Sequence, residues 1–173
     1  MKYRSTRGGV SGISFTDALL MGLADDGGLL IPDYIPDVSS NLQDWKNLDF
    51  VQIAQRVLKL FIDDVEHDDL DVLTAEAFAS FDVPEIVAWK QLDHLRVLEL
   101  FHGPTLAFKD VALQLLGKLF EHVLADRRES LNILGATSGD TGSAAIAGVA
   151  GMENIKIFIL YPKGRISSLQ ELQ

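Results

Sequence analysis

Helical periodicity dominates the first half of the chain. Between Phe50 and Phe61, apolar residues recur at intervals of three and four positions, which predicts one apolar helix face, and Asp49 stands where a cap is expected. Ser14 and Asp17 have the spacing of a capping box, with aspartate in place of the usual glutamate. They predict a shorter helix near the N-terminus.

An acidic segment follows the longer helix. Six acidic residues lie among the nine positions 63–71. A calcium-binding EF-hand loop requires a glycine at its sixth position and a closing glutamate, and neither stands at the right offset here. We therefore expect a solvated turn between helices, with a further helix through residues 76–81. A short strand is expected earlier in the chain, at 29–31.

Strands and helices alternate in the second half of the chain. The expected elements are strands at 97–101, 131–134 and 155–161 and helices at 110–124 and 141–150. This order predicts a parallel sheet with right-handed crossovers. The predicted fold class is α/β, a three-layer αβα arrangement with a Rossmann-like βαβαβ unit, preceded by a mostly helical region. We place the two domains at 1–95 and 96–173.

Composition narrows the function. The net charge of −10 disfavours nucleic acid as a partner, because phosphate backbones are bound by clustered lysine and arginine. The absence of cysteine excludes disulfides and a thiol nucleophile, and the four histidines lack metal-binding spacing, so no metal site is expected. No apolar run has the length of a secretory signal or a membrane span, so we expect a cytoplasmic protein that binds small molecules.

Lys109 stands in the loop that follows the strand expected at 97–101. A lysine at the mouth of the next helix can act as a nucleophile and form a Schiff base with an aldehyde cofactor. The alternative is an ordinary solvated lysine beside Asp110. For a lysine taken alone this alternative is favoured, although ligands of parallel sheets sit at the carboxyl ends of the strands, where Lys109 is expected.

A glycine-rich loop follows the next expected strand. Residues 135–142 hold three glycines and three hydroxyl side chains, which together with a helix N-terminus can surround a carboxylate or phosphate. A helix cap with glycines for close packing is the alternative. The triplet Asp140-Thr141-Gly142 also occurs in aspartic proteases, but one copy in an α/β pattern does not supply their paired carboxylates.

Two cations follow the last expected strand. Lys163 and Arg165 are one residue apart and are candidates to receive a phosphate group, although a solvated turn is the alternative.

Several segments of the chain, in order, resemble the threonine synthase family. The resemblance extends essentially from end to end, and the N-terminal segments separate this family from other enzymes that share only the lysine signature. The matching segments are 3–8, 14–15, 22–29, 100–110, 136–142 and 159–167.

This resemblance implies a pyridoxal-phosphate enzyme of the tryptophan synthase beta-like fold type II. Threonine synthases convert O-phospho-L-homoserine and water to L-threonine and phosphate in threonine biosynthesis, and they are carbon–oxygen lyases acting on phosphates. The resemblance implies that Lys109 is the catalytic, cofactor-holding lysine. It also implies cofactor contacts from the loop and substrate contacts from the loop and the two cations. The implied cofactor-binding residues are Lys109, Ser138, Gly139, Asp140, Thr141 and Gly142, and the implied substrate-binding residues are Thr137, Ser138, Thr141, Lys163 and Arg165.

Members of the family are more than twice as long as this chain. Their later half supplies a phosphate-binding loop and a partner for the pyridine nitrogen, so we expect the 173 residues alone to be inactive and to self-associate through uncovered apolar faces. Two alternatives stay open: a related serine/threonine dehydratase or lyase, and a non-catalytic domain.

Overall fold

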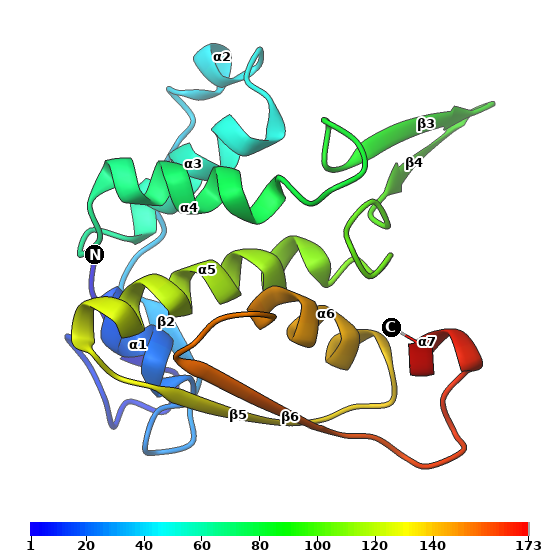
Figure 1. Cartoon of the computed structure of the whole chain (residues 1–173). Coiled ribbons are helices and arrows are strands. Elements are labelled where there is room, and N and C mark those ends of the chain that lie inside the picture. The colour runs from blue at the N-terminus through cyan, green and yellow to red at the C-terminus, as the bar shows by residue number, and fades with distance from the viewer. Residues whose placement is uncertain (173) are drawn as a thin grey trace. The chain divides into compact units, whose positions relative to one another are not determined.

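The computed structural model describes residues 1–172 and divides the chain into two compact units, Met1–Val72 and residues from Leu73 onward. Figure 1 shows the order of their helices and strands. The division does not test the domain boundary expected at 95/96, which concerns the start of the catalytic domain and stays a prediction.

The first unit combines a small antiparallel sheet with short helices. Its elements are β1 (Tyr3–Ser5), α1 (Phe15–Met21), β2 (Leu30–Pro32), α2 (Leu42–Trp45), α3 (Phe50–Phe61) and the first residues of α4 (His67–Phe78). Both expected caps are confirmed. Ser14 accepts a hydrogen bond from the backbone N–H of Asp17, and Asp49 forms a reciprocal capping box with Gln52.

The acidic segment is more helical than expected. Helix α4 begins at His67, so the prediction of a turn through residue 71 is wrong in its second half. Asp68 and Asp69 lie in the first helical turn, where carboxylates are favoured by the helix dipole, and Leu70 is fully buried. The burial of Leu70 on one side of α4 thus stabilises a helix in this acidic stretch.

A β-hairpin opens the strand-containing part of the second unit. Strands β3 (Ala88–Leu92) and β4 (Leu95–Glu99) pair in antiparallel fashion. The strand expected at 97–101 therefore exists, two residues earlier, but its pairing was predicted wrongly, because it joins this hairpin rather than a parallel sheet. Both strands are largely exposed on both faces, which removes the apolar alternation that would have revealed β3.

The α/β class is confirmed in the remainder of the second unit. The elements are α5 (Asp110–Arg127), β5 (Leu131–Ala136), α6 (Asp140–Val149), β6 (Ile155–Leu160) and α7 (Ser168–Leu172). Strands β5 and β6 pair in parallel from Leu131 opposite Ile155 to Ala136 opposite Leu160, and α6 forms the crossover between them. Figure 1 shows the two strands side by side with α6 between them in the chain.

Helices α5 and α6 pack against each other through two glycines. A Cβ atom built at Gly117 would overlap the carbonyl oxygen of Gly148 and lie 2.7 Å from the carbonyl carbon, and one at Gly148 would lie 2.5 Å from the carbonyl oxygen of Leu113. Backbone therefore meets backbone at this crossing, which only glycine permits. The contact joins the helix that follows Lys109 to the helix that follows the glycine-rich loop.

Among the described helices, none combines the length and apolar character needed to cross a membrane.

Candidate active site

Lys109 occupies the N-cap position of α5. Its backbone is already helical, with φ −66° and ψ −21°, and its side chain is half-buried. The Nζ atom lies 4.1 Å from the centroid of the Phe108 ring, a cation–π contact that holds the amine against an apolar surface. The lysine therefore projects from the rigid start of a long helix.

Asp110 fixes the loop that leads to this lysine. The carboxylate is fully buried, and it accepts hydrogen bonds from the backbone N–H of Thr105 at 2.8 Å and from the Thr105 hydroxyl at 2.9 Å. The side-chain amide of Gln114 donates a third hydrogen bond at 3.1 Å. Asp110 is thus a structural partner of its own loop.

The glycine-rich loop connects β5 to α6. The backbone N–H of Thr137 donates to the carbonyl of Leu160 at 3.0 Å, which ties the start of the loop to the end of β6. The Thr137 hydroxyl accepts from the N–H of Gly139 at 3.3 Å, and the N–H of Gly142 donates to the Gly139 carbonyl at 2.8 Å. These bonds leave the loop at the N-terminus of α6, the positive end of the helix.

Lys109 and this loop line one polar hollow of about 150 Å³. An apolar hollow beside it, of about 440 Å³, is also lined by Lys109 and Thr141, together with Phe108 and Leu113. The residues of the polar hollow are Lys109, Thr137, Ser138, Gly139, Asp140, Thr141 and Gln170. Six of these seven were singled out from the sequence, and Gln170 was missed.

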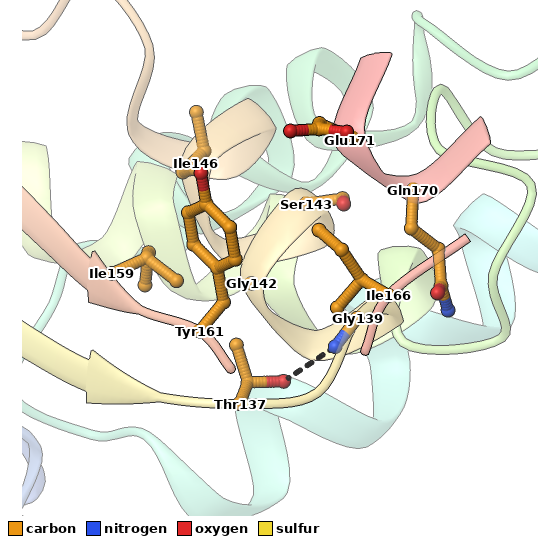
Figure 2. A pocket seen from close by; sticks show the side chains of 10 residues that line it. All are labelled: Thr137, Gly139, Gly142, Ser143, Ile146, Ile159, Tyr161, Ile166, Gln170 and Glu171. Carbon is orange, nitrogen blue, oxygen red and sulfur yellow. Dashed lines mark hydrogen bonds between the residues drawn. The ribbon is translucent and has the colours of Figure 1, made fainter. Parts of the chain in front are cut away.

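A third pocket, of about 250 Å³, is also lined by residues of the loop, among them Thr137, Gly139 and Gly142. Figure 2 shows Ile159 and Tyr161 on one side of it and Gln170 and Glu171 on the other. The Gln170 amide donates to the Asp140 carboxylate at 3.0 Å. Helix α7 therefore lies against the glycine-rich loop.

Helix α7 had a signal in the sequence. Ser167 and Gln170 have the spacing of a capping box, and their side chains bond reciprocally to each other's backbone N–H groups at 3.2 and 3.0 Å. The same glutamine side chain that caps the helix reaches Asp140.

The two cations of the last loop stand apart from the polar hollow. Lys163 and Arg165 are both exposed, and neither lines the hollow with Lys109. The N–H of Arg165 donates to the Pro162 carbonyl at 3.1 Å, which closes a turn. A phosphate contact from either cation stays a prediction.

Comparison with known proteins identifies the family. Residues 2–78 match the family model described as the threonine synthase N terminus. Threonine synthase of Schizosaccharomyces pombe is 49% identical over 185 residues, covering 100% of this chain and 36% of the relative, and that of Pseudomonas aeruginosa is 46% identical with 38% covered. This chain corresponds to the N-terminal portion of the threonine synthase family.

Solved threonine synthases share the fold as well. The structure of threonine synthase from Brucella melitensis bound to pyridoxal phosphate (PLP) superposes with a TM-score of 0.93 at 45% identity. The match covers 98% of this chain and 37% of that one. The threonine synthase of yeast gives 0.92 at 43% identity, with 98% and 37% covered. The chain therefore spans little more than a third of the length of the threonine synthases it matches.

Within the described residues, no group of three or more histidine, aspartate or glutamate side chains is arranged to hold a metal ion.

Proposed function

We propose that this chain supplies the catalytic lysine and the substrate-carboxylate loop of a PLP-dependent threonine synthase of fold type II. The observation that carries the proposal is the shared polar hollow, because it puts an amine next to a ring of hydroxyl and backbone N–H donors. A nucleophilic amine beside an anion-binding loop suits an amino acid held on an aldehyde cofactor.

The donor set of the hollow fits pyridoxal phosphate. Lys109 offers an amine for the aldehyde, and the apolar hollow beside it offers a wall for a flat aromatic ring. Ser138, Gly139, Asp140, Thr141 and Gly142 are the proposed cofactor-side contacts, from a loop whose glycines allow close backbone approach. When bound, pyridoxal phosphate supplies an electron sink for bond changes at the substrate carbons.

The candidate site residues have different proposed tasks. Lys109 would hold the cofactor through its aldehyde carbon, and the Lys109 amine, when free, would move protons between carbon atoms of the substrate. Thr137, Ser138 and Thr141 orient the substrate carboxylate at the positive end of α6. In the overall reaction, O-phospho-L-homoserine loses phosphate from its γ-carbon and gains water at its β-carbon, with Lys163 and Arg165 as candidates to hold the phosphate.

The decisive experiment maps the cofactor lysine in the protein that contains this chain. Pyridoxal phosphate is added, the bond is reduced with borohydride, and the labelled peptide is identified by mass spectrometry. We expect the label at Lys109, and Lys109→Ala should abolish both the cofactor absorbance and phosphate release. Lys90→Ala is the matched control, since Lys90 is an exposed lysine on β3. A label on any other lysine would refute the assignment.

We further propose that the chain acts together with polypeptide that corresponds to the remaining length of its relatives. Residues 1–173 expressed alone should then show no turnover. Each absent charge-assisted hydrogen bond to the cofactor would cost roughly 1.5–3 kcal/mol, so several would weaken binding by orders of magnitude. Titration with and without a separately expressed C-terminal portion tests this, and micromolar cofactor binding by the 173 residues alone would contradict it.

Self-association of the isolated segment is part of the same proposal. Leu134, Phe158 and Leu160 lie on one face of the β5–β6 sheet with exposed fractions of 71%, 57% and 61%. Parallel sheets are covered on both faces in known folds, so this face is expected to bind other apolar surfaces. Sedimentation analysis of residues 1–173 tests it.

A cytoplasmic location is proposed as well, and cell fractionation checks it.

A related lyase is the second candidate. Relatives named threonine synthase-like 2, from Xenopus laevis and Rattus norvegicus, are 42% and 38% identical over the whole chain. Because these relatives match the same segment, the reaction could differ within one scaffold. Parallel assays with O-phospho-L-homoserine, serine and threonine separate a threonine synthase from a dehydratase or lyase, and absence of all three activities favours a non-catalytic domain.

A further inference from the structure

The most deeply buried charged group near Lys109 has no task in the reaction proposed above. Asp110 is fully buried, and both of its carboxylate oxygens accept hydrogen bonds. Removing a carboxylate from water is unfavourable unless donors replace the lost hydration. A buried carboxylate directly after the proposed catalytic lysine therefore calls for an explanation.

Asp110 holds a loop in an uncommon conformation. A Cβ atom built at Gly103 would lie 2.6 Å from the Asp110 Oδ2 atom, so the turn at Gly103 lies directly on the carboxylate. Leu106, within the same loop, has a φ of +58°, a backbone conformation that residues with side chains rarely adopt. Such a conformation persists where the surrounding contacts fix it, and the two hydrogen bonds from Thr105 to Asp110 supply that constraint.

Gln114 extends these contacts to the second loop. Its side-chain amide donates to Asp110 at 3.1 Å and also to the carbonyl oxygen of Ala144 at 3.4 Å. Ala144 is fully buried in the first turns of α6, four residues after Asp140, where the glycine-rich loop ends. A single amide therefore joins the loop that carries Lys109 to the helix that carries the glycine-rich loop.

We propose that Thr105, Asp110 and Gln114 form a positioning network that fixes the place of Lys109 relative to residues 137–142. The network touches neither cofactor nor substrate and acts through the two loops. The inference rests on the proposed function for its purpose, since the alignment matters only if Lys109 and the loop serve one ligand. Its mechanical content, the coupling of the two loops, is independent of any ligand.

The first test needs no cofactor. Hydrogen exchange is measured on the protein that contains this chain, comparing Asp110→Asn with the matched control Asp126→Asn, an exposed aspartate on the same helix. Asparagine at position 110 carries an NH₂ group, so a donor that now meets a carboxylate oxygen would face another donor. We expect exchange to accelerate about tenfold both in residues 103–109 and in residues 137–145, because one lost hydrogen bond to a charged group changes local opening by this factor. The control should stay at the wild-type rate.

Gln114→Met removes the bridge between the two loops. Methionine keeps the length of the side chain and removes the amide that donates to both Asp110 and Ala144. We expect faster exchange in both segments. Acceleration confined to residues 103–109 in both variants would overturn the inference, whatever the protein binds.

The second test reads the alignment at Lys109. Thr105→Val removes the hydroxyl that donates to Asp110, and Thr105→Ser retains it. At equal folded fraction, we expect Thr105→Val to slow covalent attachment of pyridoxal phosphate and to lower kcat about tenfold with KM little changed, and Thr105→Ser to restore both. If the wild type is labelled at Lys109 and Thr105→Val changes neither the attachment rate nor kcat, the positioning role is refuted and the proposed function is not. Absence of labelling at Lys109 in the wild type would instead refute the proposed function, and the exchange experiment would still decide the coupling.

Discussion

Replacing Gly117 by alanine should separate the two helices that carry the proposed active-site loops. The added Cβ atom would overlap the carbonyl oxygen of Gly148 and lie 2.7 Å from its carbon, closer than the 3.0 Å that real Cβ atoms keep. The obstacle is backbone, which cannot rotate out of the way as a long side chain does. Helices α5 and α6 must therefore move apart.

Two opposing effects set the size of the loss. Inserting a methyl group into a packed site typically costs 1–3 kcal/mol, and a backbone obstacle places this case near the upper end, about 3 kcal/mol. Alanine in a helix interior gains about 1 kcal/mol over glycine. The difference, about 2 kcal/mol, corresponds to a fall in Tm of roughly 10 °C for a unit of about 100 residues.

Urea denaturation of the protein that contains this chain measures the effect, with Gly151→Ala as the control. Gly151 has a φ of +81° and open space around the position of a Cβ atom, so its substitution tests backbone strain without a steric obstacle. That strain should cost about 1 kcal/mol. A Gly117→Ala protein as stable as the wild type would show that the helices do not meet as closely as described.

Three further predictions concern other parts of the chain. Asp49→Ala should lose about 1 kcal/mol of unfolding free energy, because it removes the capping box of α3, and urea denaturation at an unchanged m-value would check this. Hydrogen bonds from Ser5 and then from the Gly28 backbone lower the pKa of Asp26 below 3.8, so its contribution to stability is present above pH 3.8 and is lost as the pH falls through the lowered value; an NMR titration should show this, and Asp26→Asn should remove this part of the acid sensitivity. Arg165→Ala should raise KM for O-phospho-L-homoserine and leave cofactor attachment unchanged, and unmoved saturation kinetics would assign the phosphate to other residues.

Local signals in the sequence predicted much of the fold. Helices α1 and α3 begin where Ser14 and Asp49 predicted, since a capping side chain and the apolar face beyond it are encoded within a few residues. Strand β3 escaped prediction because its side chains are exposed on both faces, so no apolar pattern marks it. The pairing of β4 with β3 is local, because only Asp93 and His94 lie between the strands, but this turn lacks the glycine that marks most two-residue hairpins.

The positioning network shows a different limit of sequence reasoning. Asp110 and Gln114 are four residues apart, the spacing of neighbours on a helix face, and this signal was available. The sequence nevertheless did not predict the burial of Asp110, because burial of a carboxylate depends on a loop that folds back over it. Thr105 supplies that loop, and its bond to Asp110 spans five residues, a spacing that neither helix nor strand periodicity marks.

The proximity of Lys109 to the glycine-rich loop has a different cause from the one the sequence suggested. The expected reason was a common sheet edge, with Lys109 after one parallel strand and the loop after the next. Strand β4 pairs only with β3 in the described structure, so that edge does not position Lys109. The close crossing at Gly117 and Gly148 and the bridge from Gln114 to Ala144 do so instead. Substitutions at the helix crossing should therefore disturb covalent attachment at Lys109 more than substitutions in the β3–β4 hairpin.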